Sequence, residues 1–110
     1  MDRNVLRSRL IRECILKLLA RVFRASPDVA VEWRQIMDGF MTSRLRYDRS
    51  DVEPELADLV EDGLIERVDV PGDDGGPVAA YRITSRGRDF VRAHFPWARI
   101  DEFSGDQRIV

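Results

Sequence analysis

The sequence is poor in the residues that disulfide scaffolds and metal proteins depend on. Its 110 residues include one cysteine, Cys14, and one histidine, His94. A lone cysteine cannot form an intrachain disulfide, which excludes a secreted disulfide scaffold. A lone histidine excludes the common histidine-rich zinc sites, and we expect no metal and no other cofactor.

Long apolar runs are also missing. No stretch approaches the roughly 18 apolar residues of a membrane span, so we expect no membrane partner. The N-terminus is basic, but it lacks the apolar core and the cleavage site of a signal peptide. These absences predict a cytoplasmic protein.

What is present describes one small globular domain. Hydrophobic residues make up 44% of the chain, and 18 basic residues stand against 20 acidic ones, for a formal net charge of −2. This balance excludes a strongly basic protein that coats nucleic acid, for which a pI above about 9 is typical. The charge is unevenly spread, because residues 1–26 are basic and residues 27–66 are strongly acidic.

The first periodic segment, residues 5–24, is predicted to be a helix. Its core-facing stripe consists of Ile11, Ile15, Leu18, Leu19 and Val22. Leu10 and Cys14 fall among basic residues on the opposite side. An apolar pair on a charged face can mark contact with a partner helix, although some exposed apolar surface is normal on any helix.

A second, shorter helix should follow the break at residues 25–28, with Asp28 as its N-cap. Its apolar face is formed by Trp33, Ile36, Met37, Phe40 and Met41. The same spacing places Gly39 on the outer face of this helix.

Residues 44–49 indicate a turn before a third helix, over residues 51–62. Ser50 and Glu53 have capping-box spacing, whereas Pro54 favours a start at Glu53, so both starts stay open. Leu56, Leu59 and Val60 should face inward, and Gly63 suits the position after the end of the helix. This helix carries six acidic residues and no Lys or Arg.

The remaining chain predicts a β-hairpin and a closing helix. Residues 64–70 and 78–84 are β-like and flank a turn rich in Gly, Pro and Asp. A last helix is expected over residues 85–95, with Thr84 as its cap and with Phe90 and Val91 facing inward. We therefore expect one domain over residues 1–95 and a C-terminal tail over residues 96–110.

This order of three helices, a hairpin wing and a closing helix is that of a winged helix-turn-helix, a mainly α fold with a small β wing. Two segments carry a closer likeness: residues 56–67, Leu-Ala-Asp-Leu-Val-Glu-Asp-Gly-Leu-Ile-Glu-Arg, and residues 81–88, Tyr-Arg-Ile-Thr-Ser-Arg-Gly-Arg. Together they resemble PadR-like and MarR-like bacterial or archaeal transcriptional regulators, over residues 5–95. No catalytic constellation or phosphate-binding glycine loop accompanies them, so we expect no enzyme.

The resemblance implies a regulator that binds double-stranded DNA, with the third helix in the major groove and the wing along the backbone. The candidate DNA-binding residues are Arg34, Arg44, Arg46, Tyr47, Arg49, Arg82, Arg86 and Arg88. The acidic third helix opposes that docking mode, because six like charges would repel phosphate. The alternative is a winged-helix interaction module that does not bind DNA and presents this helix to a basic protein partner.

The resemblance also implies a homodimer, since related regulators commonly pair through the first helix and a C-terminal extension. The candidate interface residues are Leu10, Cys14, Trp97, Ile100 and Phe103.

Overall fold

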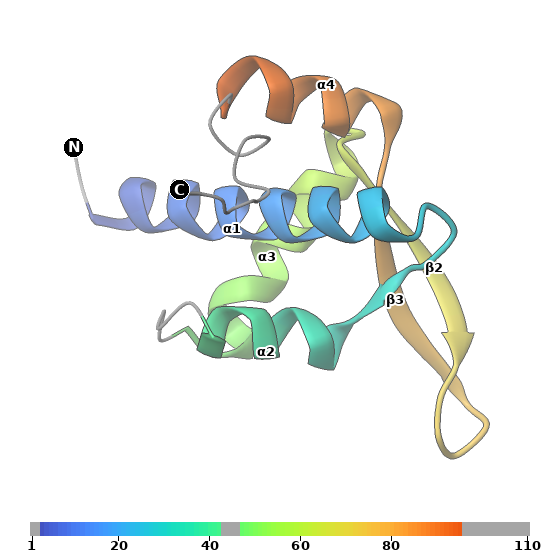
Figure 1. Ribbon diagram of the computed structural model, residues 1–110. Helices are drawn as coiled ribbons and strands as arrows, with labels where there is room; N and C mark the ends of the chain where they lie inside the picture. The colour runs from blue at the N-terminus through green and yellow to red at the C-terminus, as the bar shows by residue number, and fades with distance from the viewer. Residues whose placement is uncertain (1–2, 43–46, 96–110) are drawn as a thin grey trace.

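The longest helix lies at the centre of the molecule and the other elements pack around it (Figure 1). The computed structural model describes residues 3–42 and 47–95. Its elements are α1 (Arg3–Ala25), β1 (Val31–Glu32), α2 (Trp33–Thr42), α3 (Arg49–Glu61), β2 (Ile65–Pro71), β3 (Pro77–Ile83) and α4 (Ser85–His94). This arrangement confirms the mainly α winged helix-turn-helix fold. Residues 96–110, with Trp97, Ile100 and Phe103, lie outside the described residues.

Helix α1 is buried over a wider arc than a single stripe. It contacts α2, α3, α4 and β3. Ile11, Ile15 and Leu19 are buried as predicted, and Leu16, which the predicted stripe omits, is buried as well. A central helix has neighbours on several sides, so one apolar stripe underestimates its core.

The wing belongs to a sheet of three strands rather than to an isolated hairpin. β3 is the central strand and pairs antiparallel with both β2 and β1. The register sets Ile65 opposite Ile83 and Val31 opposite Tyr81. β1 is only two residues long, too short for an alternating pattern to be visible in the sequence, and it was therefore not predicted.

Two predictions about α2 are wrong. The helix begins at Trp33, too far from Asp28 for that residue to cap it; instead the Gln35 side chain accepts a hydrogen bond of 2.9 Å from the Glu32 backbone N–H. Gly39 does not face outward. A Cβ built at Gly39 would lie 3.1 Å from a methyl carbon of Leu18, so α2 packs closely on α1 at this position.

Helix α3 starts earlier than either predicted position. Its N-cap is Asp48, whose carboxylate accepts from the Asp51 backbone N–H at 3.3 Å, while the Asp51 carboxylate accepts from the Asp48 backbone N–H at 3.1 Å. This reciprocal pair is a capping box. Pro54 therefore lies inside the helix, and Arg49 is its first residue, which corrects the prediction that the helix has no basic residue.

Two glycines fix how the wing leaves α3 and enters α4. Gly63 has φ +79°, and the bonds Gly63 N–H to Val60 C=O and Leu64 N–H to Leu59 C=O form a Schellman motif. Gly87 lies against the Leu64 carbonyl, where a Cβ would approach the oxygen to 2.0 Å. The predicted cap is confirmed, because Thr84 Oγ1 accepts from the Gly87 N–H at 3.0 Å.

None of the helices in the described part of the chain is long and apolar enough to cross a membrane.

Candidate nucleic-acid interface

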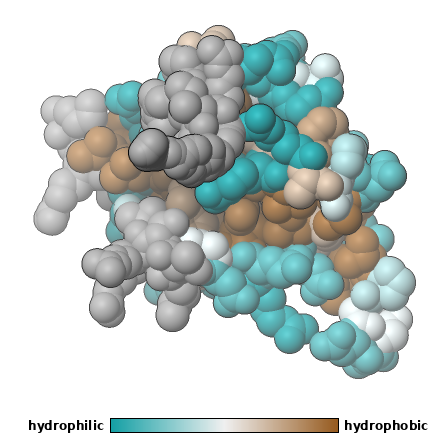
Figure 2. Space-filling view, in the orientation of Figure 1, coloured by the Kyte–Doolittle hydropathy of each residue, from teal (hydrophilic) through white to brown (hydrophobic). Residues whose placement is uncertain are grey.

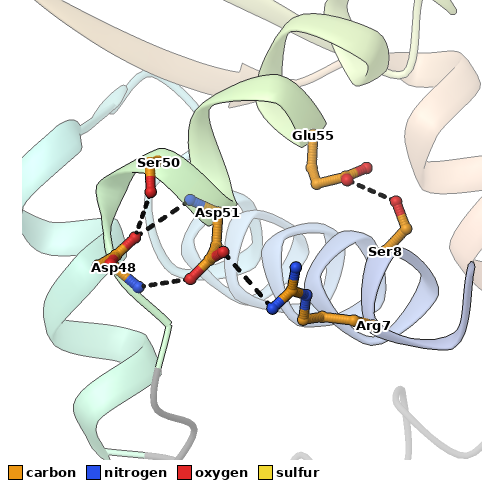
Figure 3. A network of polar contacts seen from close by, with 6 residues as sticks. All are labelled: Arg7, Ser8, Asp48, Ser50, Asp51 and Glu55. Carbon is orange, nitrogen blue, oxygen red and sulfur yellow. Dashed lines mark hydrogen bonds and ion pairs between the residues drawn. The ribbon is translucent and has the colours of Figure 1, made fainter. Parts of the chain in front are cut away.

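Helix α3 presents one of its sides to α1, and most of its acidic residues lie on that side. Arg12 of α1 reaches Glu55 at 2.7 Å and Asp58 at 2.8 Å. Arg7 lies 3.7 Å from Asp51 (Figure 3), and the hydroxyl of Ser8 donates to the Glu55 carboxylate. The basic first helix thus neutralises much of the acidic third helix inside the fold.

The outward side of α3 has a different character. Its exposed residues there are Ser50, Glu53, Pro54, Ala57 and Glu61. The α1-facing acids 51, 55 and 58 follow the i, i+4, i+7 spacing of one helix face, and this face differs from the outward one. The outward side thus carries two carboxylates, Glu53 and Glu61, while the sixth acid counted along the sequence, Asp62, is the C-cap residue after the helix.

The N-terminal turn of α3 meets the wing in a group of residues that we call the wing-side patch: Arg49, Glu53, Arg67 and Tyr81. The Arg49 guanidinium lies 4.9 Å from the centroid of the Trp33 ring and 3.0 Å from a Glu53 oxygen. Burial raises the pKa of the Tyr81 hydroxyl, and the nearby charges of Arg67, Glu53 and Arg49 act on the same group. Tyr81 is therefore a neutral hydrogen-bond donor at neutral pH.

Arg67 belongs to this patch and was not among the residues predicted from the sequence. It lies on β2, opposite Tyr81 in the register, and its side chain is 58% exposed. Its guanidinium is 3.4 Å from Asp69 on the same strand. Its position in the hairpin could have identified it, because Arg67 and Tyr81 lie opposite each other once the turn at 71–77 fixes the register.

Of the other predicted DNA-binding residues, two lie near this end of the molecule. Arg34 of α2 is exposed and lies 3.7 Å from Asp73 at the wing tip. Tyr47 is half-buried and packs edge-on against Phe40, with ring centroids 5.8 Å apart, so it serves packing. Arg44 and Arg46 lie outside the described residues.

The last three predicted arginines lie elsewhere. Arg82 is bound to Glu66 at 2.8 Å, on the sheet face opposite Tyr81. Arg86 and Arg88 belong to α4, which lies at the opposite end of the molecule from α2 (Figure 1). Arg86 lines a hollow beside the C-terminal end of α3, and Arg88 stacks on Phe23 with 4.0 Å to the ring centroid. Among the described residues of the predicted footprint, the structure thus separates Arg34 and Arg49 from Arg82, Arg86 and Arg88.

The predicted dimer residues on α1 differ in their surroundings. Leu10 is 42% exposed, whereas Cys14 packs partly against the core. Val5 and Leu6 are exposed at the same end of the helix, at 47% and 53%. Figure 2 shows this hydrophobic colouring at the N-terminal end of α1.

Solved structures with the same architecture exist. The X-ray structure of a PadR-like transcription factor from Bacteroides fragilis is 22% identical, covers 88% of each chain and has a TM-score of 0.68. The chain shares its winged-helix fold with this PadR-like protein. A second structure, from Thermoplasma acidophilum and assigned as a transcriptional regulator, is 17% identical, covers 86% of this chain and 85% of that one, and has a TM-score of 0.67.

No family model matches the sequence, and no curated protein matches it. The likeness therefore supports the PadR-like resemblance at the level of fold. The MarR-like alternative stays a prediction.

Proposed function

We propose that the protein is a homodimeric, DNA-binding transcriptional regulator that acts in the cytoplasm. In this proposal the outward side of α3 enters the major groove and the wing-side patch contacts the backbone. The PadR-like fold supports this class of function, and the residues of α3 supply the specific support.

The observation that carries the proposal is the pairing of Arg12 with Glu55 and Asp58. Acidic side chains facing phosphate would oppose binding, because affinity for DNA comes largely from Lys and Arg at phosphates. Since Arg7 and Arg12 hold three acids on the α1 side, the side turned to solvent keeps Ser50 and Ala57, which are small enough for close approach to base edges.

The two arginines of the wing-side patch supply the phosphate contacts. Arg49 is held in place by the Trp33 ring, and Arg67 lies on the neighbouring strand of the wing. Arg44 and Arg46, which precede α3 in the sequence, stay predicted phosphate contacts. This set replaces Arg82, Arg86 and Arg88, which lie away from the N-terminal half of α3.

The homodimer is supported by the exposed apolar end of α1. Val5, Leu6 and Leu10 are three of the four large hydrophobic residues that are well exposed in the described part of the chain. Burying them against a second copy would remove apolar surface from water, at about 25 cal/mol per Å². Light scattering of a Leu6→Glu, Leu10→Glu variant tests this, with a shift from dimer to monomer as the expected result.

DNA binding is tested by fluorescence anisotropy with a labelled duplex from the region upstream of the protein's own gene, over a series of salt concentrations. We expect the logarithm of the affinity to fall linearly with the logarithm of the salt concentration. Arg49→Ala and Arg67→Ala should each reduce the magnitude of that negative slope by about 1, because each removes one phosphate contact.

Arg9→Ala is the matched control, since Arg9 is an exposed arginine of α1 outside the wing-side patch. Equal losses for Arg9→Ala and Arg67→Ala would show non-specific attraction and contradict the docking mode. The opposite result is a protein that binds no duplex at low salt and is retained on an immobilised basic protein. That result would favour the interaction module over the regulator.

A further inference from the structure

A pocket of about 340 Å³ lies between the C-terminal half of α1 and helix α4, and the proposed DNA interface does not use it. Its apolar lining consists of Ala20, Phe23 and Val91. Val91 is buried and belongs to the core, and Phe23 packs against the core. The pocket therefore lies between two helices whose relative position the core fixes.

The rest of the lining is basic. It consists of Lys17, Arg21, Arg24, Arg88 and Arg92, and no acidic residue lines the pocket among the described residues. Two of these cations have acidic partners just outside it, since Lys17 lies 3.3 Å from Glu13 and Arg92 pairs with Asp89.

Two other cations of the pocket lack such partners. Within residues 5–40 and 47–95, neither Arg21 nor Arg88 forms an ion pair with an acidic residue. Arg88 instead stacks on the Phe23 ring at 4.0 Å, a cation–π contact that fixes the guanidinium at the edge of the apolar lining. The pocket thus combines an apolar lining with two arginines, Arg21 and Arg88, that no acidic residue neutralises in the described part of the chain.

We propose that this pocket binds a small organic anion, a carboxylate, sulfonate or phosphate ester on an apolar body. The anionic group would meet Arg21 and Arg88, and the apolar body would lie on Phe23 and Val91. The volume falls at the small end of the range for small-molecule sites, about 300–1,000 Å³.

A small ligand fits this pocket better than a nucleic-acid backbone does. A phosphodiester chain needs a continuous row of cations on an open surface, and its backbone has no apolar group to cover Phe23 and Val91. The pocket also lies on α1 and α4, whereas the wing-side patch lies on α3 and the sheet. Binding of the anion thus stands independently of binding to DNA.

The test is isothermal titration calorimetry of the full chain with naphthalene-1-sulfonate. Two comparison probes separate its parts: 1-naphthylmethylammonium keeps the apolar body with the opposite charge, and inorganic sulfate keeps the charge without the body. We expect the sulfonate to bind at least tenfold more tightly than either one. Equal binding of the ammonium probe, or of sulfate, would overturn the proposal.

Variants locate the site. Arg21→Gln and Arg88→Gln should each weaken naphthalenesulfonate binding about fivefold or more, and Arg9→Gln on the same helix should leave it unchanged. Thermal melting of each variant checks that it remains folded. Unchanged binding in folded Arg21→Gln and Arg88→Gln proteins would place the ligand elsewhere. Displacement of the sulfonate by duplex DNA, with equal loss of DNA binding in both variants, would instead assign the pocket to phosphate contacts.

Discussion

Replacement of Arg12 by Ala should destabilise the fold well beyond the loss of an ordinary surface charge. Arg12 bonds Glu55 through Nε at 2.7 Å and Asp58 through Nη2 at 2.8 Å. Exposed ion pairs contribute about 0.2–1 kcal/mol, whereas hydrogen bonds to charged groups contribute about 1.5–3 kcal/mol. The Glu55 side chain is only 13% exposed, so the variant would leave a largely buried carboxylate without its cation. We expect a loss of about 1.5–3 kcal/mol in the free energy of unfolding.

A double-mutant cycle isolates the pair. Urea unfolding, followed by circular dichroism at one protein concentration, gives the stability of Arg12→Ala, Glu55→Gln and the double variant. We expect a coupling energy of about 1–2 kcal/mol. The control is Lys17 with Glu13, an i, i+4 pair on one helix, for which about 0.3–0.5 kcal/mol is typical. A coupling between Arg12 and Glu55 no larger than that of the control would refute the reasoning.

The same variant should also weaken DNA binding, although Arg12 is not in the proposed interface. Without Arg12, the negative charges of Glu55 and Asp58 are no longer neutralised, and they lie on the same helix as the outward side of α3 that enters the groove. Anisotropy titrations of folded Arg12→Ala protein should show a lower affinity at low salt, and the difference should shrink as salt screens it. An unchanged affinity at low salt would contradict this role for the pair.

Three further predictions concern the caps and glycines. Gly87→Ala should cost at least the upper end of the about 1–3 kcal/mol typical of overpacking, because its Cβ would meet the Leu64 carbonyl oxygen, a backbone atom that cannot rotate away; thermal melting checks this, and a melting temperature like that of the parent would contradict it. Gly63→Ala should cost about 1–2 kcal/mol for its positive φ and Gly63→Asn less, since asparagine tolerates this conformation; equal losses in chemical unfolding would point to sterics instead. The Ser50 hydroxyl lowers the pKa of Asp48, so its carboxylate should stabilise the fold above the ordinary value of 3.8 and lose that effect as the pH falls through the lowered pKa. The stability difference between the parent and Asp48→Asn should therefore shrink in acid unfolding curves, and a constant difference would contradict the assignment.

Local chemistry allowed most elements to be predicted from the sequence. Periodicity predicted the first two helices. The positive φ that suits Gly63 predicted the end of α3, and the capping side chain of Thr84 predicted the start of α4. Each of these signals acts within a few residues. The fold was predicted from the order of the elements and from the resemblance that residues 56–67 and 81–88 carry. The structure adds a contact between these two segments, since a Cβ at Gly87 would lie 2.0 Å from the Leu64 carbonyl oxygen.

The errors arose where a contact distant in sequence decides the outcome, or where the local pattern offers two equivalent choices. Gly39 faces α1, which packs on a side of α2 that the apolar spacing does not mark. Asp48 caps α3 in place of Ser50, because both precede an acidic residue by three positions and spacing alone cannot choose between them.

The charge of α3 was misjudged because it, too, depends on contacts distant in sequence. The sequence shows its acids as a single row, whereas the fold sets Glu55 against Arg12, a residue 43 positions away. Arg67 was overlooked because its relation to α3 exists only once the wing is folded. Sequence counting therefore described the total charge correctly and its direction in space incorrectly.

Backbone amide mapping by NMR, with a duplex from the upstream region added to labelled protein at low salt, tests the central claim most directly. We expect chemical-shift changes at Ser50 and Ala57 on the outward side of α3 and at Arg67 on the wing, with little change at Arg21 and Arg92 beside the α1–α4 pocket. Changes confined to α1 and α4, or no changes at any ratio of DNA to protein, would contradict the claim.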